Sequence, residues 1–93
     1  MVDKLLDELQ SLGIDKEPVE DNNEFLIEIE DEDEWGQYFS ILDNSDLQSD
    51  PAEDELTMFN SKYIFYSKWY VYKLTSDFEK DEYALIITER NSK

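Results

Sequence analysis

The sequence predicts a single small acidic α+β domain spanning residues 1–93, in which one N-terminal helix packs on an antiparallel β-meander of four to five strands. Three observations support this fold class. Apolar residues near the N-terminus recur at helical spacing, whereas later segments alternate apolar and polar residues between turn-forming stretches. In addition, 93 residues are too few to build two hydrophobic cores of useful size.

The N-terminal segment predicts an amphipathic helix that ends at Gly13. Glycine is the usual residue just beyond a helix C-terminus, and Ile14 is placed for the hydrophobic contact that accompanies such an ending. Residues 15–23 are expected to be a polar connector. The apolar stripe of the helix, at i, i+3, i+4, i+7 and i+10, consists of Val2, Leu5, Leu6, Leu9 and Leu12.

The next segments are less uniform in pattern. Phe25, Ile27 and Ile29 alternate with Leu26 and acidic residues, which predicts a half-buried strand. Residues 35–42, WGQYFSIL, fit either a helical stripe or a strand, and their aromatic and β-branched content makes us favour the strand. Residues 43–54 are rich in acids and amides and are expected to form a loop.

The remaining chain predicts the rest of the sheet. Residues 56–76 contain no acid, three lysines and seven aromatic residues, and they indicate two strands with a break near Ser67 and Lys68. Residues 77–82 form an acidic turn, and residues 83–88 form a further strand. We expect the aromatic side chains to be core residues rather than a platform for nucleobases.

The residue inventory argues against an enzyme and against any cofactor. The chain has no cysteine and no histidine, and no nucleophile, P-loop or dinucleotide-binding motif occurs. Asp31, Asp33 and Gly36 match positions 1, 3 and 6 of a calcium loop, but Trp35 and Leu42 stand where ligands are required. We therefore expect a solvated acidic turn and no metal site.

The charge is unevenly distributed along the chain. Residues 1–55 hold twenty acids and two lysines, a net charge of −18, whereas residues 56–76 carry +3 and residues 77–93 carry −2. A net charge of −17 repels nucleic acid and anionic lipid, so we expect no direct binding to either. No signal peptide or membrane-spanning run is visible, which predicts a cytoplasmic protein.

The block EDEDE at residues 30–34 suggests what this charge does. If the strand that starts at Glu24 continues to Glu34, four glutamates project to one side about 6.7 Å apart, close to the spacing of phosphates along a nucleic-acid strand. Acidic runs are equally typical of solvated or solubilising segments, and this alternative stays open. The four glutamates are Glu28, Glu30, Glu32 and Glu34.

In overall character the chain resembles the DNA-mimic inhibitors of phages and mobile elements, which include anti-CRISPR and anti-restriction proteins. The resemblance implies a basic nucleic-acid-binding protein or nuclease as the partner. An immunity or antitoxin-type protein that masks a basic toxin, or an acidic adaptor similar to secretion chaperones, remains an alternative. The oligomeric state, monomer or dimer, stays open. The candidate partner-binding residues are Glu28, Glu30, Asp31, Glu32, Asp33, Glu34, Asp43, Asp46, Asp50, Glu53, Asp54 and Glu55.

Overall fold

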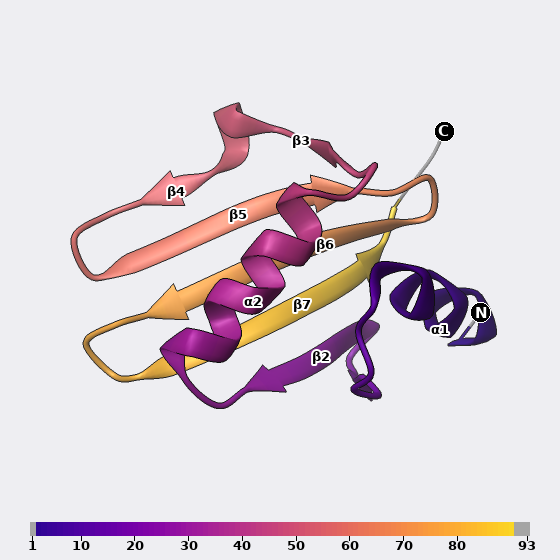
Figure 1. Ribbon diagram of the computed structural model, residues 1–93, viewed down its shortest axis with the longest axis horizontal. Helices are drawn as coiled ribbons and strands as arrows, with labels where there is room; N and C mark the ends of the chain where they lie inside the picture. The colour runs from indigo at the N-terminus through magenta and orange to yellow at the C-terminus, as the bar shows by residue number, and fades with distance from the viewer. Residues whose placement is uncertain (1, 91–93) are drawn as a thin grey trace.

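The computed structural model describes residues 2–90, which form one antiparallel sheet with a helix lying across one of its faces (Figure 1). The strand order is β1-β2-β7-β6-β5-β3, and β4 also pairs with β5. The elements are the helices α1 (Val2–Leu12) and α2 (Glu32–Asp43), the 3-10 helix η1 (Pro51–Glu53), and the strands β1 (Val19–Asp21), β2 (Glu24–Ile29), β3 (Gln48–Ser49), β4 (Glu55–Leu56), β5 (Asn60–Tyr66), β6 (Tyr70–Asp77) and β7 (Glu82–Glu89).

The predicted α+β class and the β5-β6-β7 meander are confirmed, but the predicted number of elements was wrong. Residues 2–90 form two α-helices and a seven-stranded sheet rather than one helix and four to five strands. Three of the strands are only two or three residues long, so they show no alternation that a sequence could reveal. One of them, β1, lies in the expected connector, and Asn22 and Asn23 link it to β2 with φ values of 49° and 67°.

The end of α1 has the geometry expected of a glycine-terminated helix. The Gly13 N–H donates to the Gln10 carbonyl at 3.0 Å, and the Ile14 N–H donates to the Leu9 carbonyl at 2.9 Å. Gly13 has a φ of 87°, a value that side-chain-bearing residues rarely adopt. Ile14 is buried together with Leu5 and Leu9, so the helix ending also anchors α1 to the core.

The preferred strand at residues 35–42 was wrong, because this stretch belongs to α2. Its apolar residues follow the helical stripe that was the competing interpretation. Tyr38 and Leu42 are buried against the sheet, and Trp35 and Phe39 pack beside them with ring centroids 5.9 Å apart. Tertiary packing of this stripe outweighs the β propensity of its aromatic residues.

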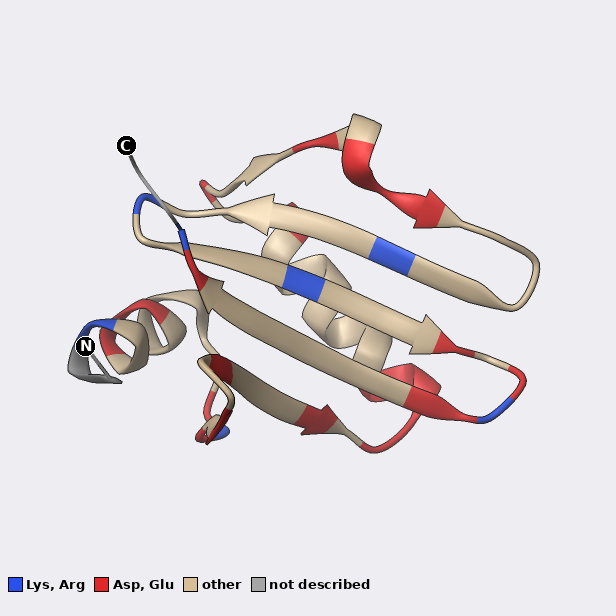
Figure 2. Ribbon diagram, turned by 180° about the vertical axis from the view of Figure 1, so that it is seen from behind, with Lys and Arg blue, Asp and Glu red and all other residues tan. Residues whose placement is uncertain are grey.

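The sheet has an inner face toward α2 and an outer face that no helix covers (Figure 2). Tyr72, Leu74, Leu85 and Ile87 are fully buried on the inner face, where they meet the stripes of both helices. The aromatic residues of β5 and β6 thus contribute mainly to the core, as the sequence predicted. The alternate residues of β6 and β7, including Lys73, project to the outer face, where most are only partly buried.

A matched pair of glycine substitutions tests the two helix assignments. Gly13→Ala should destabilise the protein by about 1 kcal/mol because alanine resists a positive φ. Gly36→Ala should instead stabilise it by about 0.5–1 kcal/mol, since Gly36 lies inside α2 and an added Cβ meets no atom within 4 Å. Urea unfolding followed by tryptophan fluorescence measures both, and effects of the same sign would contradict the assignments.

Candidate functional site

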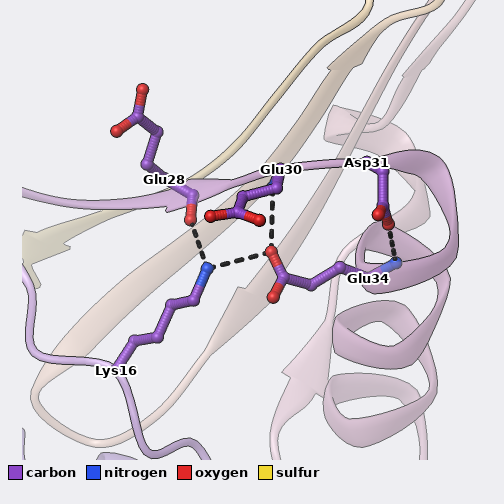
Figure 3. Close-up of polar contacts among 5 residues, drawn as sticks. All are labelled: Lys16, Glu28, Glu30, Asp31 and Glu34. Carbon is purple, nitrogen blue, oxygen red and sulfur yellow. Dashed lines mark hydrogen bonds and ion pairs between the residues drawn. The ribbon is translucent and has the colours of Figure 1, made fainter.

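The block EDEDE is the start of a helix, and the predicted straight row of four glutamates was wrong. Strand β2 ends at Ile29, and Asp31 is the N-cap of α2. The Glu34 N–H donates to Asp31 Oδ1 at 2.8 Å, while Glu34 Oε1 accepts from the Glu30 N–H at 2.8 Å (Figure 3). The first bond satisfies an N–H group that helix formation leaves free, and the second ties the residue before the N-cap to the first turn, so the chain turns here instead of continuing as a strand.

Lys16 completes this capping arrangement. Its Nζ donates to Glu34 Oε1 at 2.9 Å and to the backbone carbonyl of Glu28 at 2.9 Å (Figure 3). The hydrogen bond from the Glu30 N–H and then that from Lys16 lower the pKa of Glu34, and the bond to Glu34 raises the pKa of Lys16. Glu34 therefore has a structural role, and its charge is partly neutralised.

The other acids of the block join a second acidic segment to form one surface, here called the acidic corner. Strand β2 pairs with β7, so the end of β2 and the start of α2 lie beside the β6–β7 turn (Figure 2). The pKa of Tyr83 reports this proximity: burial raises it first, followed by the hydrogen bond to Asp81 and the charges of Glu32 and Asp31. The acidic corner comprises Glu28, Glu30, Asp31, Glu32, Asp33, Asp77, Asp81 and Glu82.

Three of these residues were absent from the predicted set. Asp77, Asp81 and Glu82 belong to the acidic turn seen in the sequence, but only the β2–β7 pairing brings that turn to Glu28. Five of the eight corner acids line an open depression of about 670 Å³ beside β2, β6 and β7. They are Glu28, Glu30, Asp77, Asp81 and Glu82.

Charge in the acidic corner works against the stability of the sheet. Asp77 and Glu82 face each other directly across β6 and β7, and like charges at such a position are destabilising. Asp77 also accepts from the N–H groups of Glu79 and Lys80 at 3.2 Å, which gives it a role in the turn. Glu82 makes no hydrogen bond or ion pair through its carboxylate among the described residues.

The remaining six predicted site residues lie elsewhere, from the end of α2 to β4, at the opposite edge of the sheet (Figure 2). Four of them hold that edge together. Asp50 Oδ1 accepts from the Ala52 N–H at 3.1 Å, and Asp54 Oδ1 accepts from the Ile64 N–H at 3.0 Å. Glu53 accepts from the Tyr66 hydroxyl, and Glu55 pairs with Lys62 at 3.3 Å. Asp43 and Asp46 complete the set, so the twelve predicted residues form two groups rather than one face.

The cations do little to neutralise the acidic corner. Within residues 2–90 only two ion pairs form, Lys16–Glu34 and Lys62–Glu55. Lys4 and Lys68 lie over the Trp69 ring, with Nζ 3.6 and 4.9 Å from its centroid. Trp69 lies in the β5–β6 turn, at the end of β6 opposite the acidic corner. Solvent and counterions therefore screen most of the negative charge of the acidic corner, and Lys80 is the cation that lies near it in the chain.

Comparisons of the chain with protein-family models, with curated proteins and with solved structures find no match. Among the described residues, no three acidic side chains come together in an arrangement that could hold a metal ion. Neither α-helix of residues 2–90 is long and apolar enough to span a membrane. The function therefore has to be inferred from the shape and charge of the molecule.

Removing the N-cap carboxylate tests the structural role of the acidic block. Asp31→Ala should lower the free energy of unfolding by about 1 kcal/mol, because the Glu34 N–H loses its acceptor. Asp33→Ala is the matched control, since it removes one charge from the same turn without removing the cap. Urea denaturation should therefore show a clear loss only for Asp31→Ala, and equal losses would contradict the capping role.

The acids of the opposite edge predict a specific alkaline response. The hydrogen bond to Glu53 raises the pKa of Tyr66 to about 12, from 10 in a free side chain. The hydrogen bond between Tyr66 and Glu53 should contribute fully to stability below about pH 10, and its contribution should disappear as the pH rises toward about 12. The reason is that Tyr66 loses its hydroxyl proton at a lower pH in the unfolded chain than in the folded protein.

Glu53→Gln should return the pKa of Tyr66 toward 10, as measured by NMR titration of the tyrosine ring carbons. Glu55→Gln removes a charge from the same edge and should leave the titration of Tyr66 unchanged, since Glu55 pairs with Lys62 instead. A Tyr66 that titrates identically in both variants would contradict the assignment.

Proposed function

We propose that this protein is a non-enzymatic binding protein whose acidic corner occupies the nucleic-acid-binding surface of a basic partner. The observation that carries the proposal is that acids from β2, from the β2–α2 connection and from the β6–β7 turn line one open depression, with the start of α2 close by and few cations near it. A basic cleft gains affinity for nucleic acid by releasing the counterions around the phosphates, and a dense cluster of carboxylates offers it the same kind of gain.

Electrostatics also explains how such a protein would act. The net charge of −17 would accelerate its encounter with a basic surface, and occupation of that surface would exclude the nucleic acid. The partner in this proposal is a nucleic-acid-handling enzyme of the restriction or CRISPR type. No reaction at the acidic corner is required, which fits a chain without histidine or cysteine.

The adaptor alternative finds less support. It requires aromatic side chains on an accessible sheet face, but Phe65, Tyr70 and Tyr72 are buried beneath the helices. The outer face presents aliphatic residues, threonines and lysines, and its aromatic residue on β5, Tyr66, is half-buried and hydrogen-bonded to Glu53. The acidic corner is accessible, because seven of its eight acids are exposed.

Competition with DNA provides the test. Fluorescence anisotropy would follow the displacement of labelled duplex DNA from purified CRISPR and type I restriction nucleases. The triple variant Glu28→Lys, Glu30→Lys, Glu32→Lys should weaken displacement about tenfold or more in ~50 mM salt. Displacement by the unmodified protein should itself weaken steeply as the salt rises to about 300 mM.

A matched control separates the position of the charge from its amount. The variant Glu20→Lys, Asp43→Lys, Asp46→Lys reverses three exposed acids outside the corner, so both triple variants carry the same net charge. Only the corner variant should lose activity. Equal losses in the two variants, or displacement that does not depend on salt, would overturn the proposal.

A further inference from the structure

Four large apolar side chains lie exposed beside the acidic corner, and we call them the apolar tip. Met58 is 84% exposed, Leu56 61%, Phe59 49% and Phe78 39%. Leu56 ends β4, Met58 and Phe59 lie in the β4–β5 connection, and Phe78 lies in the β6–β7 turn. A hydrogen bond of 2.7 Å from the Phe78 N–H to the Phe59 carbonyl joins the two loops.

The apolar tip has a defined shape before any partner binds. Thr57 and Asn60 close the β4–β5 connection, because the Thr57 N–H donates to the Asn60 carbonyl at 2.8 Å and the Asn60 N–H donates to Thr57 Oγ1 at 2.9 Å. Phe78 packs edge-on against Trp35 and Tyr83, with ring centroids 6.0 and 5.9 Å apart. Pre-organisation of this kind lowers the entropy lost on binding.

Charge on both sides of the apolar tip indicates what it contacts. On one side the chain carries Glu53, Asp54 and Glu55, and on the other it carries Asp77 and the rest of the acidic corner. Exposed apolar side chains with a charged surround have the anatomy of a protein interface, with an apolar centre and a polar rim. The complementary surface is apolar at its centre and bears lysine or arginine around it.

We propose that the apolar tip is the anchor by which this protein binds its partner, inserting Met58 and Phe59 into an apolar surface bordered by Lys or Arg. The inference rests on the proposed function for the identity of the partner. It adds an apolar contact to the electrostatic contact made by the acidic corner. A second copy of this chain fits the tip poorly, because its own tip is flanked by the same acids and would be repelled. DNA, RNA and anionic lipid are repelled for the same reason.

Two synthetic helical peptides of equal length and equal lysine content test the inference. One carries leucines along one face, and the other has glutamine at those positions. Calorimetry should show the leucine peptide binding about tenfold or more tightly, since only it covers the apolar tip. Amide NMR shifts caused by this peptide should centre on residues 56–59 and 77–82.

Substitutions connect the affinity to the apolar tip. Met58→Ser with Phe59→Ser should reduce the affinity for the leucine peptide to that for the glutamine peptide, without changing the salt dependence. The control Val19→Ser with Leu26→Ser removes two exposed apolar residues, 66% and 37% exposed, from the outer face near β1 and should change nothing. All four positions are exposed, so thermal unfolding should confirm that both variants fold.

The outcomes separate this inference from the proposed function. If both peptides bind equally and the acidic-corner triple variant binds neither, the inference about the apolar tip is overturned and the proposed role of the acidic corner is retained. Binding of the leucine peptide that survives the triple variant would support the tip and count against the corner. Conversion of a dimer to a monomer by the Met58/Phe59 variant, seen by sedimentation, would overturn the inference in favour of self-association.

Discussion

The N-terminal capping of α2 is the interaction on which the remaining architecture depends. Asp31 accepts from the backbone of Glu34 and thereby turns the chain from β2 into a helix that crosses the inner face of the sheet. This crossing places Tyr38 and Leu42 over the strands that follow, where they form the core together with the apolar stripe of α1. It also leaves the acids around the cap at the edge of the sheet, where they meet the β6–β7 turn. The packing of the core and the position of the acidic corner thus both depend on the residues of this cap.

The distribution of structural roles among the acids shows how the chain tolerates its charge. Asp31, Asp50, Asp54 and Asp77 each accept hydrogen bonds from backbone N–H groups, so their charges are stabilised by local dipoles rather than by lysines. Serine or asparagine would fill a helix N-cap about as well as aspartate does. The use of aspartate at these positions therefore adds negative charge beyond what the turns and caps need.

Local features of this fold could be predicted from the sequence, whereas features set by distant contacts could not. The α1 stripe, its Gly13 ending and the β6–β7 hairpin depend on neighbouring residues and were predicted correctly. Helix α2 was missed although Asp31 and Glu34 have the spacing of a capping box ahead of a helical stripe.

The candidate site was predicted only in part, for a related reason. Five of the eight acids of the acidic corner belong to the predicted set, but the other three join them through the β2–β7 register, which no local pattern encodes. The apolar tip could not be predicted from the sequence because Leu56 and Met58 are residue types that are usually found in a hydrophobic core. Only the three-dimensional structure shows that they project into solvent.

The position of β7 between β2 and β6 has a consequence for the order of folding. Strand β2 can pair locally with β1, but its other neighbour is β7, which comes after every other element in residues 2–90. Until then the β1–β2 hairpin has no strand that joins it to β6 and β5, which pair directly with each other. Closure of loops this long slows folding. During synthesis the two hairpins should therefore be joined into one sheet only after β7 emerges.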